Sequence, residues 1–204
     1  MARMASDLDA GTAAGNFPLP GSRQPLEPCG LPSHRLHQPE VRMGAIVLLK
    51  DDHKTVEKLF KAFEKAGDDA YAEKRRIVDE VVEELTVHAV IEEQVFYPAA
   101  REAAPDTADH VLESIEEHHV VVWMLSELAS LDPKDERFDA KMSVLMENVR
   151  HHVEEEEKDW FPQVRKAMGR NRLVELGQQL EEAKKSASRD PLKVPSAAAD
   201  RGPR

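Results

Sequence analysis

Two segments of this chain repeat one arrangement of histidine, glutamate and proline. His88 is followed four residues later by Glu92, and His152 by Glu156; a proline stands ten residues after each histidine. Residues four apart lie on the same face of an α-helix, so each segment can present an imidazole and a carboxylate side by side. These groups are common metal ligands. Two such faces, opposed across a helical bundle, would form a metal cage.

The elements that must position these groups follow from apolar residues spaced three and four apart, which predict amphipathic helices. We expect helices over about 44–66, 70–103 and 107–131, and a fourth from Pro133 to Gly169. Pro98 and Pro162 should kink or break their helices, because proline cannot continue the backbone hydrogen bonds. A shorter helix should follow over about 170–185. Short connections force antiparallel neighbours, so the predicted fold class is all-α, an up-down-up-down antiparallel four-helix bundle with a short C-terminal fifth helix.

The predicted domain organisation places this bundle at 43–168, followed by the C-terminal helix at 169–185. Residues 1–42 are rich in glycine and proline without a helical or strand period, so we expect a disordered extension. A second disordered tail is expected over 186–204. Met43 directly precedes the first periodic element, and initiation there is a hypothesis that N-terminal peptide mass spectrometry would test.

Each of the four predicted apolar stripes carries one histidine, and two also carry a glutamate. A lone histidine on an apolar face is more often a hydrogen-bonded core residue than a ligand. A buried unpaired carboxylate, however, is strongly disfavoured unless it is paired or bound to metal. The expected ligands are His53, His88, Glu92, His118, His152 and Glu156. Two ions, each with two histidines and both bridged by the glutamates, would use this set; mixed nitrogen and oxygen ligands suit iron, and manganese less well.

Two of these histidines have a histidine beside them in the sequence. The apolar stripe favours His118 over His119, and the spacing to the proline favours His152 over His151. The other two are expected to be solvated, or to support the ligands from outside.

The remaining polar and aromatic side chains near the motifs receive simpler interpretations. Glu93 and Glu157 follow the two glutamate ligands and are interpreted as solvated surface acids. Tyr97 and Trp160 are interpreted as packing residues, with a redox role for Tyr97 as a minor hypothesis.

The pattern of single histidines in the first and third helices and His-x-x-x-Glu in the second and fourth resembles the hemerythrin-like (HHE cation-binding) family over about 44–168. That resemblance implies a non-haem di-iron centre inside the four-helix bundle. Members of the family bind dioxygen, sense oxygen or iron, or handle peroxide or nitric oxide. The invertebrate oxygen carriers have a fifth histidine where this chain has Ser114. An iron lacking that imidazole would be more open, which favours reaction with peroxide or oxidation of the metal.

The charge and composition of the chain argue against several classes of protein. The net charge of −11 argues against binding to nucleic acids or anionic lipid. Cys29 is the single cysteine, so no internal disulfide can form, and no apolar run approaches the roughly 20 residues of a membrane span. We therefore expect a soluble, cytoplasmic protein.

Two functional interpretations remain open from the sequence. One is a di-iron protein that binds or senses dioxygen, nitric oxide or iron. The other is an enzyme at the same centre, which consumes hydrogen peroxide or oxidises ferrous iron. A ferritin-like carboxylate protein is disfavoured, since those use Glu-x-x-His, and a metal-free helical module is disfavoured by six buried polar groups. The oligomeric state stays open.

Overall fold

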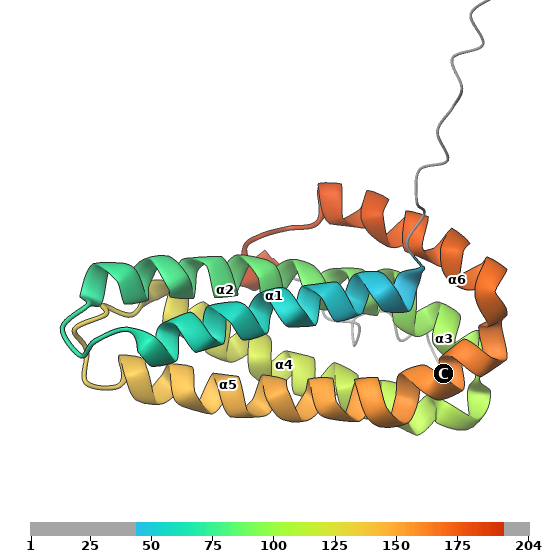
Figure 1. Cartoon of the computed structure of the whole chain (residues 1–204), viewed down its shortest axis with the longest axis horizontal. Helices are drawn as coiled ribbons and strands as arrows, with labels where there is room; N and C mark the ends of the chain where they lie inside the picture. Colours follow the sequence, from blue (N-terminus) through green and yellow to red (C-terminus); the bar gives the residue numbers. More distant parts are fainter. Residues whose placement is uncertain (1–43, 194–204) are drawn as a thin grey trace, which may run out of the picture. The chain divides into compact units, whose positions relative to one another are not determined.

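The computed structural model describes residues 44–193 of the 204-residue chain. Within this range the long helices are α1 (Ala45–Lys65), α2 (Tyr71–Ile91), α4 (Ala108–Ser130) and α5 (Phe138–Glu155). They form the predicted antiparallel four-helix bundle, in which α1 packs on α2, α2 on α4 and α4 on α5 (Figure 1). The segment 1–42, with Cys29, and Met43 lie outside the described residues.

The predicted breaks before the two prolines are π-helical turns. Glu92–Phe96 joins α2 to α3 (Tyr97–Ala103), and Glu156–Trp160 joins α5 to α6 (Phe161–Ser186). A proline ring removes one backbone donor and crowds the carbonyl four residues earlier, and a wider turn relieves both effects. Because a π turn holds more residues than an α turn, successive side chains within it point in more similar directions. Each π turn begins with one of the two predicted glutamate ligands.

One predicted helix start is wrong. The fourth bundle helix begins at Phe138, not at Pro133. The preceding loop is built from aspartate turns: Asp132 accepts a hydrogen bond from the backbone N–H of Lys134, and Asp135 accepts one from that of Arg137, both at 2.9 Å. Such local bonds compete with helix formation.

The apolar face of α4 also differs from the predicted stripe. Val122 is only half-buried and Ala129 is exposed, whereas Val121, Met124 and Leu128 are buried. α4 packs against both α2 and α5, so two neighbours, rather than one, decide which of its sides is covered.

The predicted fifth helix is the second half of α6. The helix is interrupted at Gly169, whose φ of 71° lies in the left-handed region that favours glycine. Beyond it, Leu173, Leu176 and Leu180 are buried as predicted, and α6 packs along α1 and α2. The tail was predicted to begin at residue 186, but α6 continues through Ser186, and a 3-10 turn with Pro191 buried follows at Pro191–Lys193. The rest of the predicted tail, 194–204, lies outside the described residues.

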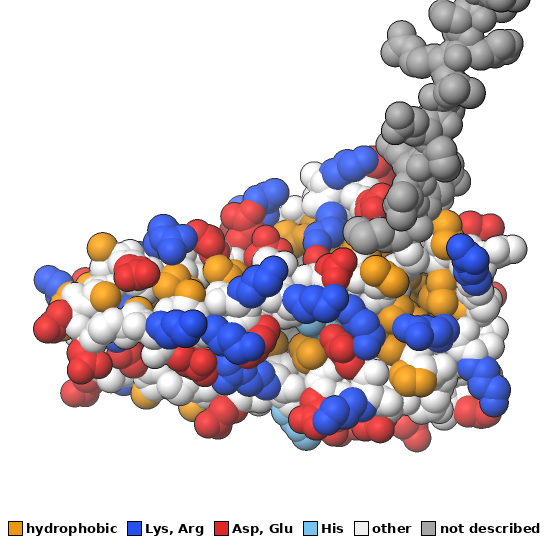
Figure 2. All heavy atoms as spheres, in the orientation of Figure 1, with side chains coloured by type: hydrophobic (Ala, Val, Ile, Leu, Met, Phe, Trp, Pro, Cys, Tyr) orange, Lys and Arg blue, Asp and Glu red, His pale blue; other side chains and the backbone are white. Residues whose placement is uncertain are grey.

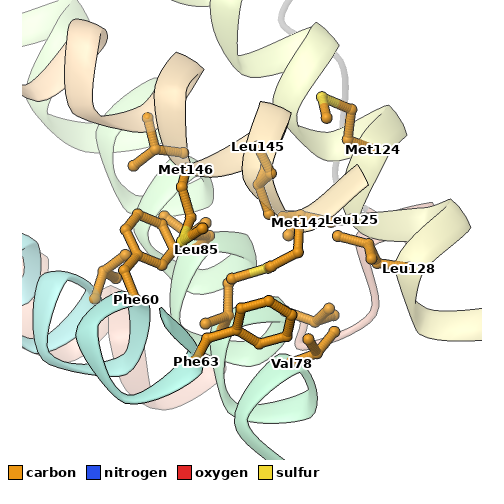
Figure 3. Close-up of a cluster of buried hydrophobic side chains, with 14 of the residues drawn as sticks. Phe60, Phe63, Val78, Leu85, Met124, Leu125, Leu128, Met142, Leu145 and Met146 are labelled. Atoms are coloured by element: carbon orange, nitrogen blue, oxygen red, sulfur yellow. The ribbon is translucent and has the colours of Figure 1, made fainter. Parts of the chain in front are cut away.

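Apolar side chains form two clusters. One, shown in Figure 3, includes Phe60, Phe63 and Met142, and the other includes Phe96 and Trp160. The predicted ligands touch both, because their imidazoles adjoin Val56 and Leu85 on one side and stack on Phe161 and Tyr97 on the other. A polar centre therefore lies between two apolar clusters that exclude water from it.

The face of the bundle seen in Figure 2 carries many charged side chains of both signs. Among residues 44–193, no helix combines the length and apolar composition needed to cross a bilayer.

Candidate metal centre

The four predicted histidines come together as two pairs, one residue from each bundle helix. The Nε2 atoms of His53 and His88 lie 3.1 Å apart, and those of His118 and His152 lie 3.2 Å apart. All four are buried, at 4–7% exposed. Two nitrogens bound at about 2.1 Å to one ion, at a right angle, would lie about 3.0 Å apart. Each pair is therefore spaced as two ligands of one cation are.

The two predicted glutamates lie across the pairs. Glu92 Oε2 is 3.1 Å from Nε2 of His88 in one pair and 3.5 Å from Nε2 of His118 in the other. Glu156 Oε2 faces the remaining two imidazoles at 3.5 and 3.7 Å. Both carboxylates are fully buried, and Glu92 Oε1 and Glu156 Oε2 have no hydrogen-bond partner among the described residues. Buried carboxylate oxygens without a partner are costly unless a cation binds them. The donor set thus fits two bridged metal ions.

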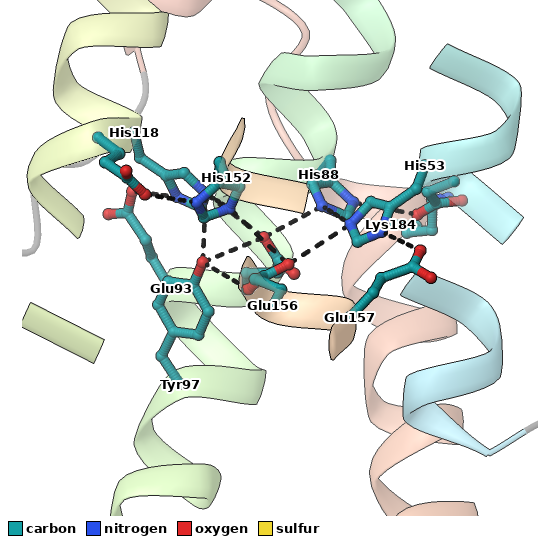
Figure 4. A network of polar contacts seen from close by, with 12 residues as sticks. His53, His88, Glu93, Tyr97, His118, His152, Glu156, Glu157 and Lys184 are labelled. Atoms are coloured by element: carbon teal, nitrogen blue, oxygen red, sulfur yellow. Dashed lines mark hydrogen bonds and ion pairs between the residues drawn. The ribbon is translucent and has the colours of Figure 1, made fainter. Parts of the chain in front are cut away.

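A carboxylate faces the outer nitrogen of every imidazole in the centre (Figure 4). Three Nδ1 atoms have hydrogen-bond distances to their carboxylates and the fourth has a longer ion-pair contact: His53 to Glu157 at 2.9 Å, His118 to Glu93 at 3.1 Å, His152 to Glu117 at 2.7 Å, and His88 to Asp52 at 3.5 Å. When Nδ1–H donates to a carboxylate, the lone pair of Nε2 is left facing the centre.

Lysines anchor two of the outer carboxylates in turn. Lys184 on α6 donates to Asp52 at 2.6 Å, and Lys50 on α1 donates to Glu157 at 2.8 Å. The second half of α6 therefore not only covers apolar surface but also orients the carboxylate of Asp52, which faces His88.

The interpretation of Glu93 and Glu157 as solvated surface acids is wrong. The Glu93 side chain is 4% exposed, and the Glu157 side chain, 29% exposed, hydrogen-bonds a buried imidazole. Asp52 and Glu117 were not among the predicted functional residues, although they face His88 and His152. The sequence did contain a signal for these outer carboxylates, the four that face an Nδ1 atom: each is the sequence neighbour of a predicted ligand. Each nevertheless contacts a histidine from a different helix.

His119 and His151 lie away from the centre. The His151 side chain is 66% exposed and lies 3.4 Å from Glu155, while His119 contacts Glu116 at 3.3 Å. Only their neighbours His118 and His152 face the bundle interior.

The Tyr97 hydroxyl reaches the centre, so the interpretation of this residue as a packing side chain is incomplete. Its oxygen lies 3.2 Å from both Glu156 Oε1 and His118 Nε2, and 3.4 Å from Glu92 Oε2. Burial and the nearby glutamates raise the pKa of Tyr97 well above its ordinary value. The hydroxyl therefore stays protonated and can donate.

Trp160 packs as predicted, with its indole N–H donating to Thr107 at 2.9 Å. Ser114 is buried.

Without a bound cation, some of the candidate ligands keep their protons at neutral pH. Burial, together with the charge of Glu92, raises the pKa of Glu156 to about 8. Burial alone would lower the pKa of His88, but the charges of Glu92 and Asp52 outweigh it and raise that pKa to about 10. Burial would raise the pKa of Glu92, but the charge of His88 and its hydrogen bond lower it to about 2. A metal cation would displace the retained protons, so its binding should tighten as pH rises.

A small cavity of about 20 Å³ adjoins the imidazoles. The four histidines line it together with apolar side chains, among them Leu85, Val121 and Val149. This volume exceeds the roughly 10–15 Å³ that one water needs, and the apolar walls offer it few partners. The cavity is therefore only slightly larger than one water requires.

Fold and site together define a helical-bundle cation-binding domain, with groups of histidine and glutamate placed to hold metal. The family model described as the hemerythrin HHE cation binding domain matches residues 44–164, and the chain belongs to this family.

An uncharacterized hemerythrin-like protein of Schizosaccharomyces pombe is 27% identical over 135 residues, which cover 66% of this chain and 66% of that protein, so the chain spans just under two thirds of its relative's length. The crystal structure of a hemerythrin HHE cation binding domain-containing protein from Mycobacterium kansasii has the same fold. It matches with a TM-score of 0.60 and 24% identity, covering 71% of this chain and 89% of that one.

Proposed function

We propose that this chain holds two iron ions, one between His53 and His88 and the other between His118 and His152, with Glu92 and Glu156 bridging them. The proposal rests mainly on the pairing of the imidazoles. In each imidazole, Nδ1 faces a carboxylate at the edge of the centre, and Nε2 faces a glutamate that lies between the two pairs. Six donors for two ions leave positions open for an exogenous ligand. Mixed nitrogen and oxygen donors with open positions favour iron, and manganese is the less favoured metal.

The proposed role is to bind or sense dioxygen or nitric oxide. The family in general binds small ligands at its metal site, and the apolar cavity beside the imidazoles has room for a diatomic molecule. Ferrous ions supply the electrons and open coordination that such ligands require. The chain's own groups keep water out, orient the imidazoles and, through Tyr97, offer a hydrogen-bond donor on the carboxylate side.

Consumption of hydrogen peroxide is the second candidate, and the Tyr97 hydroxyl favours it. Ser114 leaves the centre one imidazole short, and a protonated phenol stands 3.2 Å from His118 and from Glu156. A phenol at that place can donate a proton or hydrogen bond to a reacting oxygen. Tyr97→Phe removes only the hydroxyl, and we expect it to slow peroxide consumption while the iron content is kept. Unchanged turnover would exclude this role of Tyr97.

The proposed ligands can be tested with two adjacent histidines as variant and control. We expect about two irons per chain, by elemental analysis, in the wild type and in His151→Ala. His152→Ala should lose at least one, because His152 is buried in the centre while His151 is exposed. One zinc per chain, or a folded protein that takes up no metal, would refute the di-iron proposal.

An optical spectrum separates the two functions. Bands that change when peroxide is added, and recover as it is consumed, would favour the enzyme. A stable change on exposure to dioxygen or nitric oxide, without turnover, would favour binding or sensing. The cytoplasmic location stays a prediction.

A further inference from the structure

A groove lies along the bundle between α1 and α5. These two helices close the bundle, yet they approach each other less closely than the pairs α1–α2, α2–α4 and α4–α5. The space between them is a groove of about 580 Å³. Arg150 bridges it, with hydrogen bonds to Glu57 at 3.0 and 3.3 Å and to Glu64 at 2.8 Å. The volume falls within the roughly 300–1,000 Å³ of pockets that bind small organic molecules.

The floor of the groove is apolar. Val153, which is half-buried, and the aliphatic stems of the surrounding lysines present apolar surface in the groove, while Val56, Phe60 and Val149 lie buried beneath it. An apolar floor of this kind gains free energy by covering acyl or aromatic carbon.

The rim of the groove is cationic, in contrast to the chain as a whole. Its lining holds five lysine and arginine side chains and three glutamates, whereas the whole chain has 28 basic and 39 acidic residues. Lysine and arginine side chains gather along the face where α1 and α5 run (Figure 2). Lys58 is exposed and forms no ion pair within residues 44–193, whereas Lys54 pairs with Asp51 and Lys61 with Glu57. A free cation over an apolar floor complements a ligand with one anionic end and an apolar body.

The inner end of the groove meets the candidate metal centre. His53, Val56, Val149 and Val153 line both the groove and the small cavity beside the imidazoles. The valines therefore form a thin wall between solvent and the centre. A molecule lying on the floor of the groove would cover this wall.

We propose that the groove between α1 and α5 binds a small amphiphilic carboxylate, such as a medium-chain fatty acid, with its carboxylate at Lys58 and its carbon chain on Val153 and the lysine stems. Bound there, it covers the wall of the metal centre. This proposal does not rest on the proposed metal function, since Lys58 and the valines are not among the six candidate ligands.

Isothermal titration of the metal-free, full-length protein with decanoate, below its micelle concentration, tests the proposal. We expect saturable binding of one molecule per chain, no binding of butyrate, and no comparable binding of decyltrimethylammonium. Lys58→Glu should weaken decanoate binding about fivefold or more, because it replaces attraction by repulsion. Lys166→Glu is the matched control: Lys166 is also exposed but lies outside the groove lining, so its reversal should leave the affinity within about twofold.

A second variant tests the floor. Val153→Thr keeps the side-chain shape but replaces one methyl group by a hydroxyl, and it should weaken the binding of decanoate more than that of octanoate, since the longer chain covers more of the floor. Amide shifts on adding decanoate should cluster on α1 and α5. Equal binding of the cationic and anionic amphiphiles, or equal affinity of the Lys58 and Lys166 variants, would overturn the proposal. Neither result would bear on the iron content, so the two proposals fail separately.

Discussion

Glu117→Gln tests whether the outer carboxylates support a metal centre. Glu117 accepts a 2.7 Å hydrogen bond from Nδ1 of His152, the shortest of the contacts between an imidazole of the centre and its outer carboxylate. That hydrogen bond lowers the pKa of Glu117, so the group is a carboxylate at neutral pH. A glutamine has nearly the same shape but no charge, and its amide can turn an N–H toward Nδ1 and favour the wrong tautomer.

The expected size follows from the geometry. A hydrogen bond to a charged group contributes about 1.5–3 kcal/mol. The Glu117 side chain is 28% exposed, and water screens part of that interaction. We therefore expect a loss of about 1–2 kcal/mol, or about 5- to 30-fold in affinity for the ion that we propose His118 and His152 hold. Removing comparable outer-shell groups elsewhere costs about 10- to 100-fold.

An anaerobic competition titration of ferrous iron against a coloured chelator measures this affinity. Glu116→Gln is the control, since Glu116 is the sequence neighbour of Glu117, its side chain is 72% exposed, and it contacts His119, which lies outside the centre. Thermal unfolding of the metal-free variants should show that both remain folded. Affinities within twofold of each other for the two variants would refute the proposed support of His152 by Glu117.

Three further predictions concern the stability of the metal-free protein, measured by urea denaturation. Stability should fall from pH 7 to 9.5, because two groups hold protons more tightly in the folded than in the unfolded protein. The pKa of Glu156 is raised to about 8 and that of His88 to about 10. A flat or rising stability profile would contradict this. Phe138→Ala should cost about 3–5 kcal/mol, since Phe138 is fully buried, and a loss under 1 kcal/mol would show that the site collapses. Gly169→Ala should cost about 1 kcal/mol because φ is 71°, whereas Gly67→Ala, which meets nothing within 4 Å, should change stability by less than about 0.5 kcal/mol; equal effects would refute the backbone argument.

The His-x-x-x-Glu spacing predicted the residues that gather at the centre without any knowledge of the tertiary fold. His88 with Glu92 and His152 with Glu156 share a face because both members lie on one helix, and the helical period alone decides that. The same period placed His53 on the buried stripe of its helix. The four helices, and the kinks before the prolines, depend on equally local rules.

The outer carboxylates could not be assigned in this way. Asp52 is adjacent to His53 in the sequence but faces His88, and Glu93 follows Glu92 but holds His118. Adjacency along the chain says which helix carries a carboxylate, not which imidazole it meets. The π turns make this assignment harder still, since they change the side-chain directions of Glu93 and Glu157.

The sequence by itself therefore determined the order of the helices, the buried faces of all but α4, and the six groups of the candidate centre, because each depends on spacing within one helix. The tertiary structure decided the pairing of His53 with His88 and the approach of the Tyr97 hydroxyl. It also decided the opening between α1 and α5. These features depend on the rotation and offset of one helix against another, which follow from the packing of all side chains at once and leave no periodic signal in the sequence.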